Sequence, residues 1–154
     1  MLTLPQSKEG ARFTPALSDR LCAIARGLPD GGVVCDVGSD HGALPLYLLQ
    51  TNQCETAIVT DLNPAPLQRA RGNLEEAGLS HRAEFILTDG IADVLVHKPD
   101  AFVIAGMGGD TIAGILHRAL SQIPNGCFFA LQPMTKEERL RAFLYESGFL
   151  VTEE

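Results

Sequence analysis

The stretch Val33-Val-Cys-Asp-Val-Gly-Ser-Asp-His-Gly42 decides the fold of this chain. Its first five residues form a short apolar run typical of a buried strand, and a turn rich in glycine and acid follows. The next segment, Ala43 to Gln50, is apolar and predicted to be helical, with Pro45 tolerated because it falls in the first turn. In an open α/β sheet such a turn lies beyond the carboxyl end of a strand, where ligands bind.

The turn is acidic, which is unusual for a phosphate site. Gly38 and Gly42 allow a sharp turn and a close approach of a ligand, whereas Asp36 and Asp40 would repel a pyrophosphate. The glycine spacing also differs from the Gly-x-Gly-x-x-Gly pattern of dinucleotide-binding dehydrogenases. The turn therefore favours a cationic or hydroxyl-rich ligand and makes a dehydrogenase a poor fit.

The same cycle of strand, turn and helix repeats along the chain. The alternation, with nearly continuous apolar strands, predicts an α/β fold in which a mostly parallel, doubly wound sheet carries helices on both faces. Thr135 and Glu138 are expected to form a capping box. We predict strands at Val33–Val37, Ala57–Thr60, Ala83–Leu87, Ala101–Ala105 and Cys127–Leu131, a sixth beginning at Phe149–Val151, and helices at Ser18–Arg26, Ala43–Gln50, Asn63–Gly78, Ile91–Val96, Thr111–Leu120 and Thr135–Ser147.

Bulk properties fit one domain spanning residues 1–154. The chain is 45% hydrophobic and carries a formal net charge of −7, which argues against a non-specific nucleic-acid binder. The polar start, Met1 to Gly10, has no signal core, and no apolar run is long enough for a membrane span. The four cysteines show no zinc spacing and are expected to be reduced thiols, so we expect a cytoplasmic protein without a metal. Because the sixth strand begins only at the last residues, the C-terminal part of the domain is expected to be missing.

Three predicted strands end in an acid: Asp36, Asp61 and Asp89. The tips of parallel strands converge on one crevice, where Asp61 could accept hydrogen bonds from ribose hydroxyls and Asp89 could hold an adenine amino group. Asp36 and the following turn could face an ammonium and a sulfonium. Together they describe S-adenosylmethionine; the alternative is that each aspartate only caps the next turn or helix.

The Gly106-Met107-Gly108-Gly109 segment after the fourth strand leaves room for a flat group beside such a cofactor. The alternative is a tight strand-to-helix turn, in which Met107 fills a gap. His41 either contacts the ligand or orients the turn.

These residues identify a resemblance to the bacterial tRNA (adenine-22-N1)-methyltransferases, which are Rossmann-like class I enzymes dependent on S-adenosylmethionine. The resemblance runs from Leu17 to about Glu154. Met134 departs from it, because asparagine is expected after Gln132-Pro133. The segments that carry it are Leu17-Ser18-Asp19-Arg20-Leu21, Asp36-Val37-Gly38-Ser39-Asp40-His41, Leu44-Pro45-Leu46-Tyr47-Leu48, Ala105-Gly106-Met107-Gly108-Gly109 and Leu131-Gln132-Pro133.

The resemblance implies roles for individual residues, a tRNA substrate and S-adenosylhomocysteine as product. It also implies a helical C-terminal domain, which is absent from these 154 residues and would weaken the grip on tRNA. The oligomeric state is left open. The cofactor set is Asp36, Gly38, Ser39, Asp40, His41, Asp61, Leu62, Asn63, Asp89, Gly90, Gly106 and Met107, and the substrate set is Arg20, Met107, Gly108, Gly109, Gln132 and Pro133.

The expected chemistry needs no general base, because N1 of adenine is a neutral lone pair. Carboxylates facing the cation that forms on the ring would help most, with Asp40 as first candidate and Asp110 as second.

Two other functions stay open: a methyltransferase for a small molecule or protein, and a cofactor-binding fragment without activity. A rim for RNA phosphates, or ordinary solvated helix faces, is predicted at Arg12, Arg20, Arg26, Lys136, Arg139 and Arg141.

Overall fold

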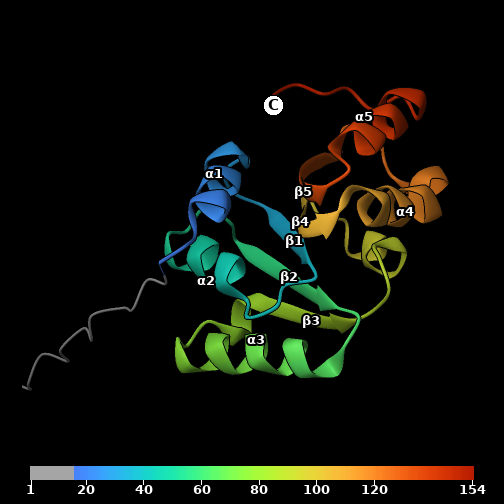
Figure 1. Ribbon diagram of the computed structural model, residues 1–154. Coiled ribbons are helices and arrows are strands. Elements are labelled where there is room, and N and C mark those ends of the chain that lie inside the picture. The colour runs from blue at the N-terminus through green and yellow to red at the C-terminus, as the bar shows by residue number, and fades with distance from the viewer. Residues whose placement is uncertain (1–15) are drawn as a thin grey trace, which may run out of the picture.

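The computed structural model describes residues 16–154, so the predictions for Met1–Pro15, including Arg12, lie outside the described residues. Strands and helices alternate as expected (Figure 1). The strands are β1 Val33–Val37, β2 Thr56–Asp61, β3 Ala83–Leu87, β4 Ala101–Gly108 and β5 Phe128–Thr135; the α-helices are α1 Asp19–Gly27, α2 Ala43–Gln50, α3 Pro64–Glu76, α4 Gly109–Ala119 and α5 Glu137–Glu146; and the 3₁₀ turns are η1 Ser80–Arg82, η2 Ala92–His97 and η3 Leu120–Gln122.

The five strands form one parallel sheet in the order β3-β2-β1-β4-β5. Strand β1 is central, with Asp36 in register with Val59 on one side and Val103 on the other. The direction of winding reverses between β1 and β4, which is the point where open α/β sheets bind ligands. The predicted Rossmann-like architecture is therefore confirmed, and the acidic turn lies at its switch point.

Helices cover both faces of the sheet (Figure 1). On one face, Ala25 of α1, Leu44 of α2 and Leu74 of α3 join a core cluster with Val34 and Val103 from the sheet. On the other face, a second cluster combines Ile112, Ile115 and Leu116 of α4 and Leu140 of α5 with Cys35, Phe102 and Ile104. Burial on both faces explains why the strands are nearly continuous apolar runs.

Strands β4 and β5 extend further than the sequence indicates. Their pairing continues through Gly108 and Thr135, across register shifts between Ala105, Met107 and Gly108. Gly106, Met107 and Gly108 thus belong to an irregular strand end, and only Gly109 begins the helix. The predicted capping box is wrong, because Thr135 stays in the sheet and Lys136 is the N-cap of α5 without a side-chain cap bond.

The predicted sixth strand is also wrong. After α5 the Phe149 amide donates to Leu144 O, and the Phe149 ring packs edge-on against Phe129 at 5.8 Å between centroids. Arg141 Nε then binds Glu154 Oε1 at 2.6 Å. These contacts hold the segment against α5 and β5, and it does not pair with the β5 edge.

Candidate cofactor and substrate site

The amides of the β1–α2 turn are used within the protein. Gly38 N and Ser39 N both donate to Thr60 O, at 2.9 and 3.1 Å, Asp40 N donates to Gly38 O, and Gly42 N donates to Ser39 O. A phosphate cradle needs such amides to point at the ligand. The geometry therefore agrees with the acidity of the turn in disfavouring a pyrophosphate.

Asp36, at the end of β1, is a buried carboxyl group that is 8% exposed. Burial raises its pKa to about 6, the Ser39 side chain opposes the rise, and the charge of Asp61 adds to it. No ion pair is made by Asp36 within residues 16–154. A cationic ligand group would compensate this buried charge, so the residue fits the ammonium or sulfonium that the sequence predicts.

Asp61 and Asp89 follow neighbouring strands, β2 and β3. Asp61 Oδ1 accepts a hydrogen bond from Asn63 N at 2.9 Å, which is the local turn role weighed as the alternative to ribose binding. Asp89 Oδ1 pairs with Arg118 Nη2 of α4 at 3.1 Å, beside the buried Gly90. Leu62, which follows Asp61 in the chain just before α3, is 62% exposed and is available to an apolar ligand face.

Asp40 and His41 lie on the exposed side of the turn. Asp40 Oδ1 is 3.2 Å from Arg69 Nη2, and Asp40 Oδ2 is 3.3 Å from His41 Nε2. The His41 ring thus lies against the carboxylate of the preceding residue, and both interpretations of His41, as a ligand contact or as a residue that orients the turn, stay predictions. The Asp40 carboxylate is therefore already in contact with two side chains, Arg69 and His41, before any ligand binds.

The turn after β1 meets the end of β4. A Cβ on Gly38 would lie 2.5 Å from Met107 Cε, so the glycine accommodates the Met107 side chain. The two segments that the sequence assigns to cofactor and substrate are thus adjacent.

A second cluster surrounds Gly106, which has φ +77°. Gly106 N donates to Gln132 Oε1 at 3.1 Å, and the guanidinium of Arg20 lies 3.7 Å from where a Cβ would stand. Arg20 Nη1 is also 3.2 Å from Met134 Sδ. The structure therefore brings Arg20 and Gln132 to the glycine segment as the sequence predicts, with Pro133 beside Met107 in the strand register.

Asp110, in the first turn of α4, is paired with the N-cap and the first turn of α5. Its Oδ2 lies 2.5 Å from Lys136 Nζ and 3.2 Å from Arg139 Nη1. Hydrogen bonding by Lys136 is the main cause that lowers the pKa of Asp110. Next to it, Gly109 approaches the Lys136 carbonyl so closely that a side chain would not fit.

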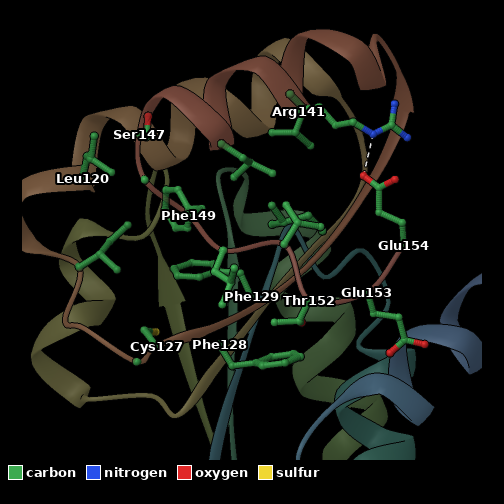
Figure 2. Close-up of a pocket in the computed structure, with 18 of the residues that line it drawn as sticks. Leu120, Cys127, Phe128, Phe129, Arg141, Ser147, Phe149, Thr152, Glu153 and Glu154 are labelled. Carbon is green, nitrogen blue, oxygen red and sulfur yellow. Dashed lines mark hydrogen bonds and ion pairs between the residues drawn. The ribbon is translucent and has the colours of Figure 1, made fainter.

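A groove of about 820 Å³ lies elsewhere, between β5, α5 and the last residues of the chain (Figure 2). Phe129, Phe149 and Leu140 line it, and the Arg141–Glu154 pair spans its rim. Among residues 16–154, its lining includes Pro133 of the predicted substrate set and Arg141 of the predicted phosphate rim. Its position at the sheet edge separates it from the strand tips.

Sequence reasoning missed Arg69, Asn73 and Arg118 as partners of the site. Arg69 and Asn73 are four residues apart on α3, a spacing that predicts a shared helix face without showing what that face contacts.

Within residues 16–154, no group of three or more His, Cys, Asp or Glu side chains could hold a metal ion. No helix in that range is long and apolar enough to cross a membrane.

Both the sequence and the structure of the chain are similar to those of known proteins. The family model described as a methyltransferase domain matches residues 17–154. The tRNA (adenine(22)-N(1))-methyltransferase of Bacillus subtilis is 32% identical over 138 residues, covering 90% of this chain and 58% of that protein. The chain thus spans less than two thirds of this relative.

Two solved structures are similar over 90% of the chain. The Bacillus subtilis M1A22 tRNA methyltransferase aligns with a TM-score of 0.85 at 31% identity and is covered over 59% of its length. A Streptococcus pneumoniae protein described as a putative tRNA (m1A22) methyltransferase, in complex with S-adenosyl-L-methionine, aligns with a TM-score of 0.83 at 33% identity and is covered over 65%. With this match and the switch-point site, the chain belongs to the methyltransferase domain family.

Proposed function

We propose that the chain is the methyl-transferring part of a tRNA (adenine-22-N1)-methyltransferase that uses S-adenosylmethionine. The observation that carries the proposal is Asp36, a buried carboxylate without an ion pair in the described chain, beside a turn whose amides are used internally. The likeness to the Bacillus subtilis enzyme supports the choice of reaction. Such an enzyme would work in the cytoplasm, where its tRNA substrate resides.

The cofactor end of the site uses the three acids at the strand tips. S-adenosylmethionine, when bound, supplies a methyl group on a cationic sulfur. Asp36 would hold the cationic end in its ionised form, Asp61 would accept from ribose hydroxyls through the carboxylate oxygen not bonded to Asn63, and Asp89 would accept from the adenine amino group. The other proposed cofactor contacts are Gly38, Ser39, Asp40, His41, Leu62, Asn63, Gly90, Gly106 and Met107.

The substrate end of the site is the irregular end of β4. N1 lies on the Watson–Crick edge of adenine, so the target base must be unpaired or turned out of its stack. The proposed contact for the flat ring is Gly106, which has no side chain beside the Arg20 guanidinium and whose amide is fixed by Gln132. Gly108 and Gly109 are occupied from the protein side, by the Thr135 side chain and the Lys136 carbonyl, and so shape the strand end next to it. Arg20, which makes no ion pair within residues 16–154, would approach the same nucleotide.

The reaction leaves positive charge on the target ring, so the chain's own work is orientation and placement of carboxylates. Asp40 is the first candidate and Asp110 the second. Asp110 is paired with two permanent cations, Lys136 and Arg139, whereas Asp40 is paired with one, Arg69, and with the titratable His41, which makes Asp110 the weaker candidate. The exposed Lys136 and Arg139 side chains would instead contact RNA phosphates.

The test uses two tRNA transcripts that differ only at position 22, one with adenine and one with guanine, with methyl-labelled S-adenosylmethionine. We expect label on the adenine-22 transcript alone. Equal labelling of both transcripts would place the modification elsewhere, and labelling of a metabolite or protein extract in place of tRNA would support the other substrate classes. Cofactor binding without transfer to any of these would favour a binding fragment.

A further inference from the structure

Helix α3 contacts three consecutive residues of the β1–α2 turn. Arg69 pairs with Asp40, Asn73 Nδ2 donates to His41 O at 2.8 Å, and Ala70 packs against Gly42. A Cβ on Gly42 would lie only 2.9 Å from the Ala70 Cβ, and Gly42 itself is buried. The three α3 residues share one helix face, which forms the support of the turn.

The Asn73 hydrogen bond is the most specific of these contacts. Both contacts lie at the surface, but the Arg69–Asp40 ion pair, with side chains 49% and 69% accessible, is screened by solvent and such pairs contribute little, whereas Asn73 bonds a backbone carbonyl. In an α-helix, a backbone carbonyl accepts a hydrogen bond from the amide four residues later. For His41 O that residue is Pro45, which has no N–H, and Asn73 Nδ2 supplies the missing donor. The Asn73 amide therefore satisfies a backbone carbonyl at the position where the turn passes into α2.

The same helix also follows the ribose-binding end of the proposed site. α3 begins at Pro64, three residues after Asp61, and reaches Asn73 two and a half turns later on its axis, at about 3.6 residues per turn. One rigid element thus links the acid at the tip of β2 to the turn at the tip of β1. The helix thus connects the two ends of the proposed cofactor site.

We propose that Asn73 is a positioning residue, which holds the Ser39–Gly42 turn in the geometry that receives the amino-acid end of the cofactor. The inference rests on the proposed function and adds a residue outside the ligand contacts. It predicts that loss of the Asn73 donor weakens ligands with an amino-acid tail and spares ligands without one.

The experiment compares S-adenosylhomocysteine with methylthioadenosine, which has the same nucleoside and no amino-acid group. Asn73→Leu removes the donor at similar side-chain size, and Asn73→Ala does so with good helix propensity should the leucine variant fold poorly. Gln68→Leu is the matched control, because Gln68 is an exposed amide on the same helix. Affinities come from calorimetry, with thermal unfolding measured in parallel.

We expect Asn73→Leu and Asn73→Ala to weaken S-adenosylhomocysteine by about threefold to tenfold, the size of one hydrogen bond, and to leave methylthioadenosine unchanged. Gln68→Leu should change neither affinity. Equal weakening of both ligands, or no change, in a folded Asn73 variant would overturn the positioning role while leaving the proposed function intact. Failure of the unmutated chain to bind S-adenosylhomocysteine would overturn both.

Discussion

Gln132 Oε1 accepts a hydrogen bond from the Gly106 amide at 3.1 Å and so joins the ends of β5 and β4 where their register shifts. The Gln132 Nε2 group donates to Pro133 O at 2.9 Å, so both ends of this amide are used by the backbone. Gln132 thereby shapes the glycine segment and does not simply extend toward a substrate.

Gln132→Leu should therefore slow methyl transfer without weakening the cofactor. Small misplacements of reacting groups cost up to about a hundredfold in rate, and we expect a loss of about tenfold or more in kcat. Single-turnover transfer to the adenine-22 transcript, with S-adenosylhomocysteine affinity as the control, measures this. A cofactor affinity reduced in parallel with the rate would place Gln132 in the cofactor site.

Gly42 and Gly72 should respond to alanine in opposite directions. Gly42 has φ +68° and no space toward Ala70, so Gly42→Ala is expected to lower the free energy of unfolding by about 2 kcal/mol or more. Gly72 lies inside α3 with nothing within 4 Å of where a Cβ would stand, so Gly72→Ala is expected to add about 0.5–1 kcal/mol. Urea denaturation of both variants tests the pair, and effects of the same sign would contradict it.

Asp36 should make stability depend on pH in the direction opposite to most carboxylates. Because its folded pKa is raised from 3.8 to about 6, the folded state binds the proton more tightly than the unfolded state. Stability from this group is therefore greatest below pH 3.8, falls as pH rises through about 6, and is absent above that value.

Asp36→Asn removes this dependence. The variant should gain stability over the unmutated chain as pH rises from 4 to 7, reaching about 3 kcal/mol, while it binds S-adenosylhomocysteine more weakly at pH 7.5. Denaturation at a series of pH values measures the first effect and calorimetry the second. Parallel pH curves for the two proteins would show that burial does not perturb Asp36.

Arg82 should be a structural residue outside the site. Its guanidinium donates to Glu55 O, Leu49 O and Cys54 O, at 3.0, 3.2 and 2.8 Å, and so connects the residue before β3 to the last turn of α2 and to the loop between α2 and β2. Arg82→Met keeps a long unbranched side chain and removes the guanidinium donors, and it is expected to lower the free energy of unfolding by about 1–3 kcal/mol. Arg26→Met, at an exposed arginine of α1, is the control in thermal unfolding and should have little effect.

Asp40→Asn should separate catalysis from binding. Because Asp40 is also a proposed cofactor contact, its substitution is expected to weaken S-adenosylmethionine somewhat, and the catalytic role predicts a further fall in kcat of about tenfold or more at saturating cofactor. Asp110→Asn should have the smaller effect on kcat, because Asp110 is paired with both Lys136 and Arg139, whereas among residues 16–154 Asp40 is paired with one permanently charged side chain, Arg69. Full transfer by Asp40→Asn with unchanged affinity would remove Asp40 from the catalytic candidates.

The sequence predicted most accurately those strands and helices whose ends are defined by neighbouring residues. The bounds of β1, α2 and β3 match the sequence prediction because apolar runs, Pro45 and flanking turns define them without reference to distant residues. The capping box and the sixth strand were wrong because tertiary contacts override local preference there. Thr135 is held in the sheet by Gly108, and Phe149 is held on Phe129.

The candidate site was likewise predicted where it depends on local sequence and sheet topology, and missed where it depends on tertiary contacts. That the acids of β1, β2 and β3 share one edge follows from a parallel sheet, so Asp36, Asp61 and Asp89 could be grouped from sequence. The arginines that pair with acids of the site could not be found this way, because Arg69 lies 29 residues from Asp40 and Arg118 lies 29 residues from Asp89. Which helix face meets which turn depends on how α3 and α4 rotate against the sheet.

The central position of β1 has a consequence for how the chain opens and folds. Residues 33–87 supply β1, β2 and β3 as one continuous half, and residues 101–135 supply β4 and β5, so the β1–β4 ladder is the seam between the halves. Gly38 and Met107 meet across this seam, at the mouth of the proposed site. A ligand held by both sides would bind only the joined state, and would lower the population of the opened state by a factor of one plus the ratio of free ligand to Kd. Amide exchange along the β1–β4 ladder is therefore expected to slow as S-adenosylmethionine is added.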